Sequence, residues 1–214
     1  MPKLIKNLSA ILAGFALSQS LAGLALAADP KPAAPPSITF GKQDAKLAPA
    51  GTYALDSKHA SVLARVSHIG YSYSIFRFDD VTGSLTWDPA KPEASKLSAT
   101  VGVASIRTNV EGFAEELRGD KYLKSGAFPK ATFTSTAFRQ TDAAHGQVDG
   151  QLSLMGKTVP VTFDVALVGA GPGFGAPRIG VEATGRIKPT DFGLNPMLGE
   201  AIELVIDVEF AKAP

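Results

Sequence analysis

The sequence predicts an all-β protein, an antiparallel β-barrel of about eight strands with a short helical insert near residues 109–125. Between Ile202 and Phe210 every second residue is large and apolar, whereas the residues between them are mostly acidic. Because side chains alternate between the two faces of a strand, this pattern predicts one buried and one solvated face. Similar stretches recur at regular spacing, which favours a barrel or a sandwich over parallel βαβ units.

The other expected strands are separated by turn signals. Residues 88–92 contain two prolines in a segment that no strand could run through. Met155-Gly156-Lys157 is typical of a tight hairpin connection. Gly83 predicts a bend in the longest strand, since glycine inside a strand often marks a bulge or corner. Strands are expected over residues 52–56, 61–69, 75–87, 96–106, 131–139, 147–154, 158–168, 178–187 and 202–210.

The helical insert begins at a segment that fits a capping box. The Thr108 hydroxyl and the Glu111 carboxylate are spaced to accept hydrogen bonds from free amides at a helix start. Phe113 and Leu117 then lie four residues apart, on one face of the expected helix. The insert either lies across one end of the barrel as a lid or packs on its outside.

Residues 1–27 have the features of a secretory signal peptide. Lys3 and Lys6 precede an apolar run over residues 8–26, and a small-residue cleavage site ends at Ala27. Cleavage after Ala27 is expected, and an uncleaved membrane anchor is the alternative. Export of a chain without cysteine suits a bacterial periplasm better than a disulfide-bonded secreted domain, so we expect a periplasmic location.

Composition divides the rest of the chain in two. Residues 28–50 are rich in proline and alanine and predict a disordered tether with little to bury. Residues 51–214 form the expected β-barrel domain, of a size that one hydrophobic core can serve. The formal net charge is +1 and no basic cluster is present, which argues against a nucleic-acid partner.

The sequence contains no motif that predicts catalysis or metal binding, so we expect neither an enzyme nor a resident cofactor. It lacks a Gly-x-Ser-x-Gly elbow and a thiol. The histidines, His59, His68 and His145, do not have the spacing of a metal site. Asp-Phe-Gly at residues 191–193 lacks the other kinase signatures and predicts a turn. The glycine-rich residues 169–175 predict a flexible loop rather than a phosphate cradle.

The apolar residues leave two interpretations of the barrel interior. Large aromatic side chains can fill it as a solid core, or the barrel can hold one small ligand, because eight strands give room for either. Several inward positions carry small residues, which leaves volume and favours a cavity. These are Ala64, Ala99, Gly150, Ala183 and Gly185.

A series of short motifs runs through the domain in a fixed order. They are YALD at residues 53–56, HASV at 59–62, SHIG at 67–70, SIRT at 105–108, LRGD at 117–120, FPKATFTS at 128–135, VDGQLSLMGKTVPV at 148–161 and DFG at 191–193. In these motifs the chain resembles the YceI-like family, secreted bacterial proteins with a lipocalin-like barrel that bind polyisoprenoid lipids. Each motif alone is weak, but their order and spacing cover about residues 52–212.

The resemblance implies a periplasmic carrier whose barrel holds a long-chain isoprenoid or related lipid, such as a quinone tail, a polyprenyl lipid or a fatty-acid derivative. The lipid head group is expected at the barrel mouth, near His68, Arg107, Arg118 or Asn195. A transient contact with a membrane surface and a homodimer are compatible with this role. The alternative is a non-catalytic stress or surface-interaction module with a filled core. The expected ligand-binding residues are Val62, Val66, His68, Phe76, Phe78, Trp87, Phe113, Leu117, Tyr122, Phe133, Phe163, Phe192 and Leu194.

Overall fold

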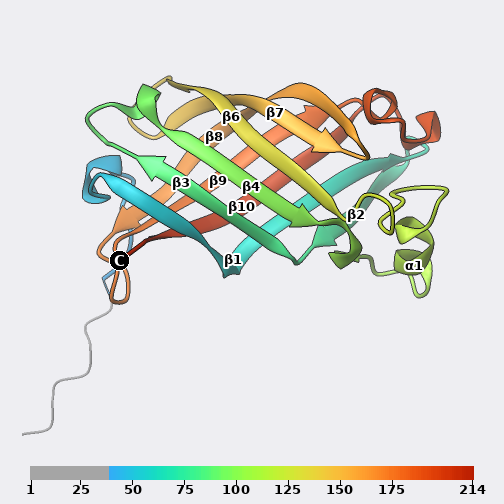
Figure 1. Ribbon diagram of the computed structural model, residues 1–214, viewed down its shortest axis with the longest axis horizontal. Coiled ribbons are helices and arrows are strands. Elements are labelled where there is room, and N and C mark those ends of the chain that lie inside the picture. The colour runs from blue at the N-terminus through green and yellow to red at the C-terminus, as the bar shows by residue number, and fades with distance from the viewer. Residues whose placement is uncertain (1–38) are drawn as a thin grey trace, which may run out of the picture. The chain divides into compact units, whose positions relative to one another are not determined.

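The computed structural model describes residues 39–214 and shows strands that wrap around a common interior (Figure 1). The predicted signal peptide and the first part of the predicted tether lie outside the described residues. The strands are β1 (Gly51–His68), β2 (Ser72–Phe78), β3 (Val81–Trp87), β4 (Lys96–Gly102), β5 (Ile106–Arg107), β6 (Lys130–Gln140), β7 (His145–Leu154), β8 (Lys157–Gly171), β9 (Arg178–Ile187) and β10 (Ile202–Lys212). The helical elements are η1 (Ala45–Leu47), η2 (Pro92–Ala94), η3 (Val103–Ser105), α1 (Phe113–Arg118), η4 (Pro189–Phe192) and η5 (Pro196–Leu198).

The strands of residues 39–214 form a closed, eight-stranded antiparallel barrel, which confirms the predicted fold class. The order around the barrel is β10-β9-β8-β7-β6-β4-β3-β1, and pairing of β1 with β10 closes it. β2 pairs with the second half of β1 and with the short β5, so these two segments extend the walls made by β3 and β4. Closure removes the free strand edges that otherwise invite association.

β1 joins two segments that the sequence analysis separated. Its register against β10 shifts between Leu55 and Ala60, so residues 56–59 form a bulge within one strand. Before the bulge β1 pairs with β3, and after it with β2. The predicted alternation of residues 61–69 is therefore confirmed. The gap expected between the strands 52–56 and 61–69 is instead a bulge that bends a single strand.

The strand predicted over residues 75–87 is broken at Asp79 and Asp80 rather than bent at Gly83. The Ser105 hydroxyl accepts hydrogen bonds from the backbone N–H groups of Asp79 and Asp80, at 3.1 and 3.0 Å, and fixes the kink between β2 and β3. Gly83 remains within β3. A Cβ atom there would lie 2.8 Å from the carbonyl oxygen of Ser98, so glycine permits the close approach of β4.

The alternation and the tight hairpin that the sequence predicts are both present. In β10 the side chains of Ile202, Val208 and Phe210 are buried, on the face that points inward. β7 and β8 are joined through Met155 and Gly156, whose φ angles are 51° and 75°. Positive φ at both central residues of a two-residue connection is the type I′ geometry, which matches the twist of paired strands.

The helical insert covers one end of the barrel, and its predicted capping box is wrong. α1 begins at Phe113 with Gly112 as its N-cap, at φ 74° and without a side-chain cap. The Thr108 hydroxyl instead accepts a hydrogen bond from the N–H of Val110, at 3.3 Å. The buried Leu117 packs into the core cluster at this end. Of the two placements left open by the sequence, the structure shows the one across the barrel end (Figure 1).

The tether prediction is wrong over its last part. η1 forms within residues 45–47, Ala48 is completely buried, and Lys42 makes an isolated β-bridge with Ala170. Short apolar side chains and backbone hydrogen bonds therefore hold this segment against the barrel end opposite α1 (Figure 1). Over residues 39–214, none of the helices has the length and apolar character needed to cross a membrane.

Candidate ligand cavity

The barrel encloses an apolar cavity of about 330 Å³. Its lining comes mainly from β1, β2, β3, β4, β6, β7, β8, β9 and β10, because these strands turn alternate apolar side chains inward. Three of the small inward residues predicted to leave volume, Ala64, Ala99 and Ala183, do line the cavity. A cavity lined this way excludes charged ligand groups from its interior and favours hydrocarbon.

Two aromatic rings occupy the centre of the barrel wall. Phe133 and Phe163 lie edge to face, with centroids 5.2 Å apart and ring planes at 86°, and both line the cavity. A Cβ atom at Gly150 would lie 2.3 Å from the Phe133 ring, and one at Gly185 would lie 2.7 Å from the Phe163 ring. These two glycines therefore make room for the rings, which corrects the expectation that they leave free volume.

The cavity extends from Leu123 and Leu194, which belong to or pack against the core cluster beside α1, to the opposite end of the barrel. There its lining includes backbone and side-chain atoms of the β6–β7 hairpin, residues 139–147, together with Ala45 of η1. In this hairpin the backbone N–H of Leu167 donates to the Ala144 carbonyl oxygen at 2.7 Å, which ties the turn to β8. Gln140, Asp142 and His145 are among the polar residues that line the cavity at this end.

The four residues expected near the head group lie elsewhere, and none of them lines the cavity. Arg107 pairs with Asp79, and Arg118 donates to the Ile106 carbonyl oxygen at 3.1 Å. Asn195 caps η5 by accepting a hydrogen bond from the N–H of Met197. His68 is exposed at the end of β1, where the strand extends past the barrel interior. The placement of the head group near these residues is therefore still a prediction.

The remaining predicted ligand-binding residues fall into two groups. Six of the thirteen line the cavity, namely Val62, Phe78, Trp87, Phe133, Phe163 and Leu194. Six others belong to, or pack against, the core cluster beside α1, namely Val66, Phe76, Phe113, Leu117, Tyr122 and Phe192. Alternation placed the strand residues of both groups on the inner face, but it does not distinguish a side chain that lines a cavity from one that fills a closed end.

Trp87 gives the cavity a spectroscopic reporter. It is the single tryptophan of the chain, and it lines the cavity near the end opposite α1. Its indole nitrogen is buried without a hydrogen-bond partner among the residues described. Since tryptophan emission depends on the polarity and quenching groups around the indole, filling of the cavity is expected to change it.

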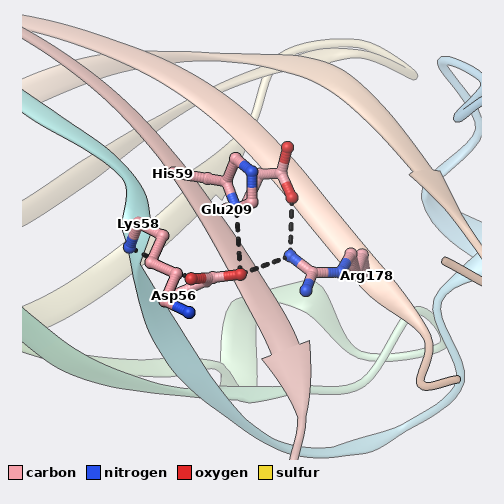
Figure 2. Close-up of polar contacts among 5 residues, drawn as sticks. All are labelled: Asp56, Lys58, His59, Arg178 and Glu209. Carbon is pink, nitrogen blue, oxygen red and sulfur yellow. Dashed lines mark hydrogen bonds and ion pairs between the residues drawn. The ribbon is translucent and has the colours of Figure 1, made fainter. Parts of the chain in front are cut away.

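A second polar cluster lies on the outer surface, at the bulge of β1 (Figure 2). Arg178 places its Nη1 atom 2.7 Å from carboxylate oxygens of both Asp56 and Glu209. His59 lies 3.0 Å from Asp56 through its Nδ1 atom. The hydrogen bonds from His59 and Arg178 hold the pKa of Asp56 well below its ordinary value, and Asp56 in turn raises the pKa of Arg178.

This bulge cluster has the ligand types of a metal site, but its charges are already balanced. Potential ligand atoms of Asp56, His59 and Glu209 lie within 4.8 Å of one another. The guanidinium of Arg178 bonds to both carboxylates and so occupies the position that a cation would need (Figure 2). We therefore interpret the cluster as an ion-pair network that fixes the bulge.

Comparison with known proteins places this barrel in a family. The YceI-like domain matches residues 53–210. The chain belongs to the YceI-like family. Protein YceI of Escherichia coli O157:H7 is 37% identical over 166 residues, which are 75% of this chain and 86% of that protein. The match covers the barrel from the first residues of β1 to the end of β10.

Solved structures share the YceI-like barrel. The Campylobacter jejuni YCEI protein is 28% identical and aligns with a TM-score of 0.63 over 70% of this chain and 91% of its own. A polyisoprenoid binding domain from Saccharophagus degradans, implicated in plant cell wall breakdown, aligns with a TM-score of 0.56 at 15% identity, over 75% of this chain and 98% of its own. The second likeness is one of fold.

Proposed function

We propose that this YceI-like protein is a periplasmic carrier that binds a long-chain isoprenoid or a related amphiphilic lipid inside its barrel, without catalysing a reaction. The observation that carries the proposal is the apolar cavity of about 330 Å³ within a closed barrel. Its presence favours a container over the alternative of a filled core. The polyisoprenoid binding domain of similar fold supports the ligand class, and the predicted signal peptide supports the location.

The size and chemistry of the cavity set what it can hold. Ligand pockets commonly have volumes of roughly 300–1,000 Å³, so this cavity suits a ligand at the small end of that range or one segment of a longer chain. Each methylene buried from water contributes roughly 0.8 kcal/mol, so a hydrocarbon tail binds without polar contacts. Polar groups of the β6–β7 hairpin then meet the head group at the end of the barrel.

The proposal is tested by filling the cavity with one side chain. Ala183→Leu adds volume on the inner face of β9, where Ala183 lines the cavity. Ala166→Leu is the matched control, because Ala166 lies on β8 beside β9 but does not line the cavity. Binding of geranylgeraniol is followed through Trp87 emission.

We expect the parent protein and Ala166→Leu to bind the alcohol equally well. Ala183→Leu should bind it about tenfold more weakly, a loss of ~1.4 kcal/mol. Equal binding by all three proteins would contradict the cavity as the site. Failure of the parent protein to bind geranylgeraniol, a quinone or a fatty acid would overturn the container itself.

A further inference from the structure

The segment before β1 crosses the end of the barrel opposite α1, where Ala45 and the β6–β7 hairpin line the cavity. We call residues 40–48 the strap. Lys42 and Ala170 exchange both backbone hydrogen bonds, with N to O distances of 3.0 and 2.8 Å. The side-chain amide of Gln43 donates to the Leu167 carbonyl oxygen at 3.2 Å. These contacts attach the strap to the outer end of β8.

The strap and β8 approach each other closely at glycines on both sides. A Cβ atom at Gly41 would lie 3.4 Å from the Cα atom of Gly169, and one at Gly169 would lie 3.2 Å from the Gly41 carbonyl carbon. A Cβ atom at Gly171 would lie 3.7 Å from the Cα atom of Gly41. The first part of the glycine-rich stretch, predicted as a flexible loop, therefore forms the end of β8 on which the strap rests.

The strap also reaches the cavity. Ala45 is one of the cavity-lining residues, and Ala48 is completely buried in the core cluster at this end. The Tyr53 hydroxyl donates to the Pro49 carbonyl oxygen at 2.6 Å, which anchors the chain where it enters β1. The strap is thus fixed at its junction with β1 and attached along β8 by backbone contacts.

The strap is held more weakly than the barrel it covers. Its larger apolar side chains point away from the core, since Phe40 is 81% exposed and Leu47 is 41% exposed. Leu47 is only partly covered, and Ala48 is the one residue of the strap that is fully buried. Segments with few buried apolar contacts and exposed hydrogen bonds open at lower free energy than the global fold. Lifting of the strap is therefore expected without unfolding of the barrel.

We propose that the strap is a lid on the cavity, and that lipid enters and leaves when the strap lifts from β8. This inference rests on the proposed function and deepens it by assigning the route of exchange. The strap precedes residues 53–210, so it lies outside the part of the chain that matches the YceI-like domain. Closure by the strap lengthens the residence of the lipid, and opening permits transfer.

A reversible disulfide tests the lid directly. Lys42→Cys with Ala170→Cys places two thiols at a hydrogen-bonded antiparallel pair, whose Cα atoms are about 5.5 Å apart, within the range that a disulfide spans. The chain has no other cysteine, so no competing pair forms. The matched control is Ser153→Cys with Thr158→Cys, a cross-strand pair on β7 and β8 whose hydroxyls lie 2.7 Å apart.

Stopped-flow mixing with geranylgeraniol, read through Trp87 emission, measures the exchange rate. We expect oxidation of the strap pair to slow uptake and release by about tenfold, and reduction to restore both rates. Oxidation of the control pair should leave them unchanged. A separate variant without cysteine, Gln43→Ala, removes the hydrogen bond from the Gln43 amide to the Leu167 carbonyl oxygen. It should speed exchange by about fivefold.

Equal exchange rates in the oxidised and reduced strap variants would overturn the lid. So would failure of the disulfide to form in the folded protein, because the strap would then not lie on β8. If the proposed function itself is wrong, the result is different. Geranylgeraniol then binds to none of the parent protein, the oxidised strap variant and the reduced strap variant.

Discussion

The two ends of the barrel are closed in different ways. At the α1 end, Phe113 lies between Phe76 and Tyr122, with ring centroids 6.2 Å away from each, and Phe192 is only 1% exposed. At the other end, the strap closes the interior with two alanines and backbone hydrogen bonds. One end is therefore packed with aromatic side chains, whereas the other is covered by a segment with few large buried side chains.

The largest expected effect is a difference in stability between variants at the two ends of the barrel. Phe192→Ala removes a fully buried ring from η4 and should lower the free energy of unfolding by about 3–5 kcal/mol, because the site cannot collapse onto the cavity left behind. Phe40→Ala on the strap should change it by less than about 0.5 kcal/mol. Urea denaturation measures both, and similar losses for the two variants would remove the distinction.

The next effect concerns the aromatic pair between the two ends. Gly150→Ala would place a Cβ atom 2.3 Å from the Phe133 ring and 2.5 Å from the Thr134 carbonyl oxygen, so both the ring and the backbone must move. We expect a loss of about 1–3 kcal/mol and weaker binding of geranylgeraniol. The control is Gly180→Ala, where the nearest atoms lie at 3.7 Å. An unchanged free energy of unfolding in Gly150→Ala would contradict the close packing of the Phe133 ring against Gly150.

The smallest effect tests the ion-pair network at the β1 bulge. The carboxylate of Asp56 has a lowered pKa in the folded protein, so it stabilises the fold above its ordinary value of 3.8. That contribution is lost as pH falls through the folded pKa. Asp56→Asn should therefore cost about 1 kcal/mol at neutral pH and progressively less below about pH 4.

The pH dependence is measured by urea denaturation at neutral and acid pH. The exposed Asp207, on the same strand as Glu209, provides the control variant Asp207→Asn. The network is wrong as described if Asp56→Asn and Asp207→Asn change stability equally at every pH.

Much of the barrel follows from local pattern. The alternation in β10, the hairpin at Met155 and Gly156, and the inward placement of Phe133 and Phe163 were all predictable, because strand geometry fixes which face a residue occupies. The kink at Asp79 was not, since it depends on Ser105 from a later segment. Side-chain pattern alone cannot report contacts that the chain makes after it closes on itself.

The candidate site shows the same division between local and long-range information. Six predicted residues line the cavity, but none of the four residues expected near the head group does, because no local signal says where a cavity reaches the surface. Ala45 was missed as a lining residue, since a proline- and alanine-rich segment normally predicts a tether. The sequence feature that could have indicated this contact is the glycine-rich stretch, because Gly169 and Gly171 lie close to the backbone of Gly41.

The central claim is that the barrel holds a hydrophobic lipid, and organic extraction of the purified mature protein followed by mass spectrometry tests it most directly. We predict an isoprenoid or acyl lipid in amounts close to one per protein molecule, strongly reduced in Ala183→Leu and unchanged in Ala166→Leu. A clean extract from folded protein that also takes up no added quinone or polyprenol would contradict the account.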